Sequence, residues 1–394
     1  MTSKLKFLFG SYIVVSVALF LYSFTQVDLS LTLSEASWWQ IVQKFFQQIG
    51  YFNRPLSTLL YLILIFLFFI FYSLFIKLAQ KNQINTEKLW VLILMVTGIL
   101  TFSYNAFSYD LFNYIFDAKI ITFYNQTPYA HKALDYVGDP MLTFMRWTHR
   151  IYPYGPIWLF LTAPLSYLGF NLFLPTFFLF KIFNSLYFLG TAFFIQKILQ
   201  KTKRNESLGL ILFALNPLVI IESLISSHND TAMMFFAILS IYLLFQHKKT
   251  LSIVSLLLSV GVKFATIFLL PSYLYYFFRN KFKNFTNEKF IELNFILMFL
   301  ALIAVILRTN FQPWYLLYII PLASLLPGKN YAVAGSIILP FFALLEYIPY
   351  LYKGDWNDPI PQVLMGITMF GAFTYIVYIA LSFRYDKLSL QGGK

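Results

Sequence analysis

The chain has 394 residues, of which 59% are hydrophobic, 21% aromatic and only 11% charged. Soluble domains carry about 25% charged residues, so this composition excludes an ordinary water-soluble protein and predicts a membrane protein. Its apolar runs lack alternating polarity, which favours helices over the roughly 10-residue alternating strands of a barrel. We therefore expect an all-α, polytopic helical membrane protein with about 11–13 transmembrane helices, forming one integral domain over residues 1–394.

The net charge is +13, and the chain contains no cysteine. The lack of cysteine excludes disulfides and thiolate metal ligands. Lysine and arginine gathered in cytoplasmic loops explain the positive charge of a membrane protein better than nucleic-acid binding does. We predict a multi-pass protein of the cell membrane, surrounded by lipid, with both termini in the cytoplasm and no nucleic-acid partner.

The first hundred residues contain three apolar runs and one amphipathic segment. Lys4 and Lys6 precede the first run, which predicts an uncleaved first helix with its N-terminus inside. Residues 34–50 carry Trp38 and Phe45 on one face and glutamines on the other. This pattern is typical of a helix lying flat at the outer interface. The predicted spans here are residues 7–24, 55–76 and 89–107.

The region after residue 156 is apolar with short polar breaks. Residues 157–200 allow either three short crossings or one crossing plus a re-entrant hairpin, with breaks near Gly169 and Pro175. Residues 251–278 begin and end inside, so we expect a helical hairpin that turns near Lys263, followed by a basic inner segment at 279–289. The other predicted spans are residues 207–225, 231–245, 290–307, 316–326, 331–348 and 363–383.

Residues 108–155 form the longest polar stretch, and we expect them to be an outer catalytic loop with short amphipathic helices. If Ser108 caps a helix that starts at Asp110, then Asn113, Tyr114 and Asp117 share its face with Asp110. A polar stripe this dense is typical of a cleft lining. The alternative is purely structural, with Asp110 a charge at a helix start and Asp117 a solvated residue.

Further polar residues interrupt the apolar second half. The sequence SSHND at 226–230 is expected at the outer tip of a hairpin between two spans, where His228, Asn229 and Asp230 either serve a site or cap the returning helix. Lys263 lies between apolar runs, where a cation needs a partner such as a lipid phosphate. Arg308 is also explained by snorkelling to the interface. Lys181 and Glu222, within or near spans, could each be half of a structural ion pair.

Several short motifs occur along residues 100–315, and together they resemble the type-C glycosyltransferases. The likeness is greatest to bacterial polyprenyl-phosphate-mannose-dependent α-mannosyltransferases that extend lipomannan-type glycans. The motifs are, in order, Ser108-x-Asp110-x-x-x-Tyr114, Thr127-Pro128-Tyr129, Tyr154-Gly155-Pro156-Ile157-Trp158, Asn216-Pro217-Leu218, His228-Asn229-Asp230, Lys263 before Pro271, and Gln312-Pro313-Trp314-Tyr315.

This resemblance implies an inverting transfer of mannose or another hexose from a polyprenyl-phosphate donor to a glycan or glycolipid on the outer face. Asp110 would be the catalytic base, and Lys263, with His228 or Arg308, would stabilise the leaving phosphate. No cofactor is required, although a divalent metal would fit if Asp110, Asp117 and Asp230 converge. The expected substrate-binding residues are Tyr114, Asp117, Tyr154, His228, Asn229, Asp230, Lys263, Arg308, Gln312 and Trp314.

A transporter or flippase of lipid-linked sugars is the alternative function. Lys181, Glu222 and Lys263 would then line a path through the membrane. Many transporters show inverted internal repeats, and we find no repeat in this sequence. The transferase is therefore the preferred hypothesis.

Overall fold

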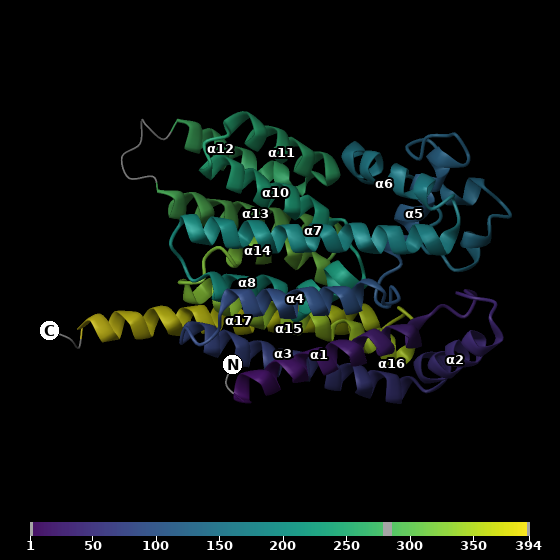
Figure 1. Cartoon of the computed structure of the whole chain (residues 1–394), viewed down its shortest axis with the longest axis horizontal. Helices are drawn as coiled ribbons and strands as arrows, with labels where there is room; N and C mark the ends of the chain where they lie inside the picture. Colours follow the sequence, from purple (N-terminus) through teal and green to yellow (C-terminus); the bar gives the residue numbers. More distant parts are fainter. Residues whose placement is uncertain (1–2, 279–285, 392–394) are drawn as a thin grey trace.

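The computed structural model describes residues 3–278 and 286–391, with side chains described up to residue 382. All the regular elements within these ranges are helices (Figure 1). The prediction of an all-α membrane protein is therefore confirmed. The predicted inner segment at 279–289 lies mostly outside the described residues.

Six helices of the described chain are long and apolar enough to cross a membrane. Their great length follows from near-continuous apolar sequence, since about 20 such residues span the hydrocarbon layer. They are α1 (Ser3–Ser23), α3 (Arg54–Gln80), α7 (Phe173–Lys201), α13 (Asn287–Thr309), α15 (Asn330–Leu345) continued by α16 (Tyr347–Lys353), and α17 (Ile360–Gln391).

A bent pair of helices raises this number to seven. The helices α8 (Glu206–Ala214) and α9 (Pro217–Ile220), with its continuation η5 (Ile221–Ile225), meet at an angle of 52°. Pro217 lacks a backbone N–H, and the residue before a proline avoids helical geometry, so the break falls at Asn216. The side chain of Asn216 then accepts the free N–H of Leu218 at 3.0 Å.

Shorter apolar helices fill the remainder of the bundle. The predicted total of about 11–13 crossings depends on these helices, because only six or seven in the described chain pass the length test. They are α6 (Pro156–Leu168), α10 (Asp230–Phe245), α11 (Lys249–Val262), η6 (Phe264–Leu269) with α12 (Leu270–Phe277), and η8 (Pro313–Tyr318) with α14 (Ile320–Ala323).

Two predicted spans differ in the structure. The helix α7 runs without interruption for 29 residues after α6, so the hypothesis of three short crossings within 157–200 is wrong. The break between them lies at residues 169–172, where Phe170 and Asn171 adopt positive φ angles. The predicted third span is shorter than expected, because α4 (Thr86–Thr101) ends at Thr101 and irregular chain leads to the polar stretch.

The helices run roughly parallel to the long axis of the molecule (Figure 1). The amphipathic α2 (Ser37–Gln47), α5 (Asp110–Thr122) and the loop to residue 155 gather at the end opposite the C-terminal part of α17. Every residue from 207 to 234 is buried. The bent pair and the start of α10 are therefore the core around which the other helices pack.

The helix α2 is amphipathic, as predicted, and turns its polar face toward the protein. Gln43 and Gln47 are buried, and the Gln43 side chain donates to the carbonyl of Leu31 at 2.7 Å. Trp38 and Phe45 are exposed. An apolar face directed away from the protein suits a membrane interface, which remains a prediction for this helix.

Candidate active site

Asp110 begins α5, as the sequence predicts. The backbone N–H of Asp110 donates to the hydroxyl of Ser108 at 3.1 Å, and a carboxylate in the first turn is favoured by the helix dipole. The Asp110 side chain is nevertheless buried rather than solvated at the helix start. Burial of a carboxylate is costly unless cations or hydrogen bonds compensate it.

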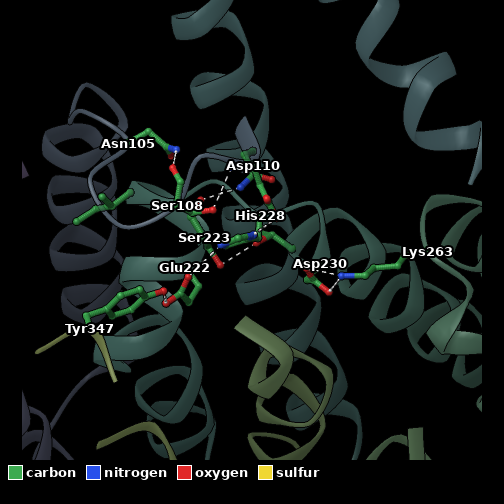
Figure 2. A network of polar contacts seen from close by, with 12 residues as sticks. Asn105, Ser108, Asp110, Glu222, Ser223, His228, Asp230, Lys263 and Tyr347 are labelled. Atoms are coloured by element: carbon green, nitrogen blue, oxygen red, sulfur yellow. Dashed lines mark hydrogen bonds and ion pairs between the residues drawn. The ribbon is translucent and has the colours of Figure 1, made fainter. Parts of the chain in front are cut away.

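Two cations compensate Asp110. His228 Nδ1 lies 3.6 Å from one carboxylate oxygen, and Arg150 Nη2 lies 3.9 Å from the other. Figure 2 shows Asp110 directed toward His228, although 118 positions separate them in the chain. Two of the sequence candidates therefore meet, and Arg150 joins them from the end of the polar loop.

His228 lies between two carboxylates. Its Nε2 is 3.3 Å from Glu222 Oε2, and the other Glu222 oxygen accepts the hydroxyl of Tyr347 at 2.8 Å. The ring of Trp314 stacks on the imidazole, with a centroid separation of 4.2 Å. His228 and Glu222 are fully buried, so ion-pair contacts and ring stacking hold the imidazole in place, although neither ring nitrogen has a hydrogen-bond partner in the described chain.

The charges around His228 perturb its protonation and that of Asp110. Burial alone would lower the pKa of His228, but the carboxylates of Asp110 and Glu222 raise it to about 9. Burial alone would likewise raise the pKa of Asp110, yet His228, with Arg150, holds it below its usual value. At neutral pH the pair is therefore a carboxylate beside an imidazolium.

This coupling predicts a stability that depends on pH. The His228 pKa is higher in the folded state than the unfolded value of 6.5, so its stabilising contribution is complete below that value and is lost as pH rises through about 9. We expect the unfolding temperature in detergent to fall over this interval. His228→Gln should flatten the fall, and an equally steep fall in the variant would contradict the assignment.

Lys263 and Asp230 form a second pair, in which Asp230 is fully buried and Lys263 is partly buried. The Lys263 ammonium lies 2.8 Å and 3.0 Å from the two Asp230 oxygens (Figure 2). It also lies over the rings of Tyr315 and Tyr318, at 5.4 Å and 5.6 Å from their centroids. The predicted turn near Lys263 is correct, because α11 ends at Val262 and Lys263 is extended. The lysine thus has the partner that its depth requires.

The segment 226–229 is completely buried, whereas the sequence suggested a polar hairpin tip. The buried ammonium of Lys181 stabilises the chain just before this segment. This ammonium donates to the carbonyl of Ile225 at 2.8 Å, to the carbonyl of Leu224 and to the hydroxyl of Ser103. Lys181 therefore binds backbone carbonyls rather than a carboxylate, while Glu222 pairs with His228.

We expect Lys181→Met to destabilise the protein. The substitution leaves the carbonyls of Leu224 and Ile225 without their donor in a buried position, at about 1–3 kcal/mol for each unsatisfied group. Thermal unfolding of the purified variant should occur at lower temperature than the parent. The matched control is Lys197→Met on the same helix, because Lys197 is only partly buried and donates to the side chain of Gln200. An equal effect of the two substitutions would contradict this role.

The other predicted site residues differ in how far their side chains are buried within the protein. Tyr114 is fully buried and contacts the ring of Tyr154 edge-on at 5.3 Å, and its role in substrate binding stays a prediction. Asn229 is buried, and neither of its side-chain polar atoms has a hydrogen-bond partner in the described chain. Gln312 is partly buried just before η8.

Arg308 does not join the cluster. It is exposed at the end of α13, and no hydrogen bond or ion pair connects it to the other candidates within the described ranges. A role in substrate binding stays a prediction for this residue. The snorkelling interpretation accounts for its position.

Arg150 and Tyr347 were not identified from the sequence. Arg150 belongs to a polar loop with several basic residues, and nothing in its local pattern distinguishes it from Arg146. Tyr347 lies 125 positions from Glu222, in a region without a recognisable motif. Only the packing of α16 against α3 and the core brings its hydroxyl to the site.

The hypothesised metal site at Asp110, Asp117 and Asp230 is not formed in this structure. In the described part of the chain, no group of three or more His, Asp or Glu residues is placed to hold an ion. Asp110 faces His228 and Arg150, and Asp230 faces Lys263. Cationic side chains of the protein therefore lie beside Asp110 and beside Asp230, where a metal ion would have to bind.

Comparison with known protein families gives one match. Residues 9–279 match the model of the N-terminal domain of the alpha-(1->6)-mannopyranosyltransferase family. The match includes Asp110, Arg150, His228 and Lys263. No curated protein and no solved structure matches the chain significantly.

Proposed function

Because the chain belongs to the alpha-(1->6)-mannopyranosyltransferase family, we propose that this membrane glycosyltransferase uses a polyprenyl-phosphate donor. Mannose passes to a hydroxyl of a glycan or glycolipid on the outer face of the membrane, with inversion at the anomeric carbon. The convergence of Asp110, His228 and the Lys263–Asp230 pair, from three distant segments, is the observation that supports this proposal.

Asp110 acts as the general base. An acceptor hydroxyl must lose its proton as it attacks, and a positioned carboxylate takes that proton. The pKa of Asp110 is below its usual value because of His228 and Arg150, despite burial, so the carboxylate is ionised and ready to accept. Its side chain retains some exposure of its surface, which leaves access for a hydroxyl group.

Lys263 receives the leaving phosphate. A phosphate leaves as an anion, so a nearby cation stabilises the transition state more than an acid would. An ammonium has three N–H donors, and Asp230 accepts two of them. We assign the third donor to a phosphate oxygen, since about a fifth of the Lys263 side chain is exposed (19%).

His228 positions Asp110. Its imidazolium is held by Glu222 and by the stacked ring of Trp314. Holding the base in one orientation beside two substrates lowers the entropic cost of the reaction. In this proposal Glu222 and Tyr347 act through His228 and do not touch the substrates.

The proposal is tested by measuring whether the protein consumes a polyprenyl-phosphate sugar donor. Protein reconstituted in lipid nanodiscs is incubated with radiolabelled polyprenyl-phosphate mannose and an α-(1→6)-linked mannobiose. We expect a labelled trisaccharide and free polyprenyl phosphate. Transfer from a nucleotide sugar, with the lipid-linked donor untouched, would overturn the donor assignment.

The structure gives no support to transport as an alternative. The hypothesis relied on Lys181, Glu222 and Lys263 lining a path, but Lys181 binds backbone carbonyls, Glu222 contacts His228 and Tyr347, and Lys263 pairs with Asp230. Each of the three residues thus has a partner within the protein. Movement of labelled lipid in sealed vesicles without a new glycosidic bond would restore that alternative.

A further inference from the structure

A small pocket lies between α5 and the end of the polar loop, and Arg150 of its lining also contacts Asp110. Its inner space is only about 10 Å³, roughly the room of one water molecule, but it opens to solvent, so a larger ligand would bind at its mouth. Its polar lining comes from Asn113, Asp117 and Arg150, and its aromatic lining from Trp147 and Tyr154. The mechanism proposed above assigns no ligand to this pocket.

The pocket contains an unused hydrogen-bond donor. The Nδ2 of Asn113 is buried and has no partner in the described chain, and Asn113 itself is 8% exposed. Buried polar groups nearly always find a partner in protein, water or ligand. A polar group buried without a partner at the wall of a pocket points to a ligand that provides an acceptor there.

Asp117 adds a second group suited to hydroxyls. Burial raises the pKa of Asp117 to about 8, against the lowering influence of Arg150. At neutral pH the group is then largely protonated, and a carboxylic acid both donates and accepts a hydrogen bond. This combination matches a neutral sugar hydroxyl better than an anion.

Trp147 provides the apolar part of the pocket. Its ring is 52% exposed, and Arg150 lies over it at 5.0 Å from the centroid. Small-molecule sites combine such an aromatic surface with a few placed polar groups. The guanidinium covers one face of the indole, and the exposed part of the ring gives a flat surface for the C–H face of a pyranose ring.

The position of the pocket relative to Lys263 and Asp110 indicates which of the two substrates it binds. Lys263, which we assign to the donor phosphate, is not among its lining residues. Arg150 lines the pocket and also contacts Asp110, and Asn113 and Asp117 lie three and seven positions after Asp110, on the same face of α5. A ligand in the pocket is therefore adjacent to the base and separate from the phosphate position.

We infer that this pocket binds the terminal sugar ring of the acceptor glycan, with Asn113 and Asp117 contacting ring hydroxyls and Trp147 covering the apolar face. The inference rests on the proposed transfer reaction. It makes these three residues determinants of acceptor specificity, and it places the attacking hydroxyl toward Asp110.

Steady-state kinetics test the inference with two substrates varied independently. Trp147→Ala and Asp117→Asn should each raise the KM for α-(1→6)-mannobiose by about tenfold, a loss of about 1.4 kcal/mol, and leave the KM for polyprenyl-phosphate mannose unchanged. Trp356→Ala is the matched control, because Trp356 has a similar exposure of 54% and stacks on Tyr350 instead. A rise in the donor KM alone would assign the pocket to the donor and overturn the inference.

A binding measurement separates this inference from the proposed function. Saturation-transfer NMR with α-(1→6)-mannobiose on the Asp110→Asn protein requires no turnover and no donor. We expect binding that Asp117→Asn, added to this protein, weakens and Trp356→Ala does not. If the parent protein consumes no polyprenyl-phosphate mannose, yet mannobiose binding is weakened by Asp117→Asn and not by Trp356→Ala, the donor assignment is wrong and the assignment of the pocket to the acceptor sugar is kept. Transfer with no effect of Trp147→Ala or Asp117→Asn would overturn the pocket alone.

Discussion

Asp110→Asn lowers the rate of mannose transfer by about 10²–10⁴-fold, the usual contribution of a general base. Asparagine preserves the shape of the side chain but takes no proton from an attacking hydroxyl. The variant remains folded, because Ser108 still accepts the backbone N–H at the helix start. Activity in nanodiscs and thermal unfolding in detergent measure the two quantities separately.

The control for this variant is Asp135→Asn. Asp135 lies on the same polar loop, but it is exposed and pairs with His131 at 3.7 Å rather than with the cluster. Its replacement should leave the transfer rate unchanged. Normal turnover by Asp110→Asn, with Asp135→Asn equally active, would remove Asp110 from the mechanism.

His228→Gln should have an intermediate effect, because His228 acts through Asp110. Glutamine loses the charge that keeps the Asp110 pKa low, so the base is protonated over a wider range of acidic pH. The pH dependence of kcat/KM should then shift its acidic limb to higher pH. A variant that lost activity by misfolding alone would show a uniform decrease without this shift.

The sequence predicted the parts of the site that carry local patterns. The start of α5 at Asp110 follows from Ser108 and from the polar face that includes Asn113 and Asp117. The turn at Lys263 follows from an interruption between apolar runs. These predictions rest on helix capping, periodicity and the cost of a cation among apolar residues.

No local sequence pattern predicts which of the polar residues contact one another in the folded protein. Glu222 and Lys181 were both expected as halves of ion pairs, yet only Glu222 forms one, because Lys181 donates to the carbonyls of Leu224 and Ile225 at the C-terminal end of η5. Segment 226–229 was expected at a polar tip and is buried instead. Long-range packing decides these partners, and a single sequence contains no record of it.

Lys263→Met should strongly lower both the stability of the protein and its rate of mannose transfer. Asp230 is fully buried, and removing the one cationic contact that it makes within the described residues leaves an uncompensated charge at a cost of about 3–5 kcal/mol. The same substitution removes the ammonium assigned to the donor phosphate. A large fall in activity by this variant alone would therefore not distinguish a structural role from a role in binding.

A double substitution makes the distinction. In Lys263→Met with Asp230→Asn the buried charge is absent, so most of the lost stability should return. If Lys263 binds the phosphate, the double variant still shows a raised KM for polyprenyl-phosphate mannose and a low kcat. If activity returns together with stability, Lys263 serves only to neutralise Asp230, and another cation must stabilise the leaving group, with Arg150, 3.9 Å from Asp110, the next candidate.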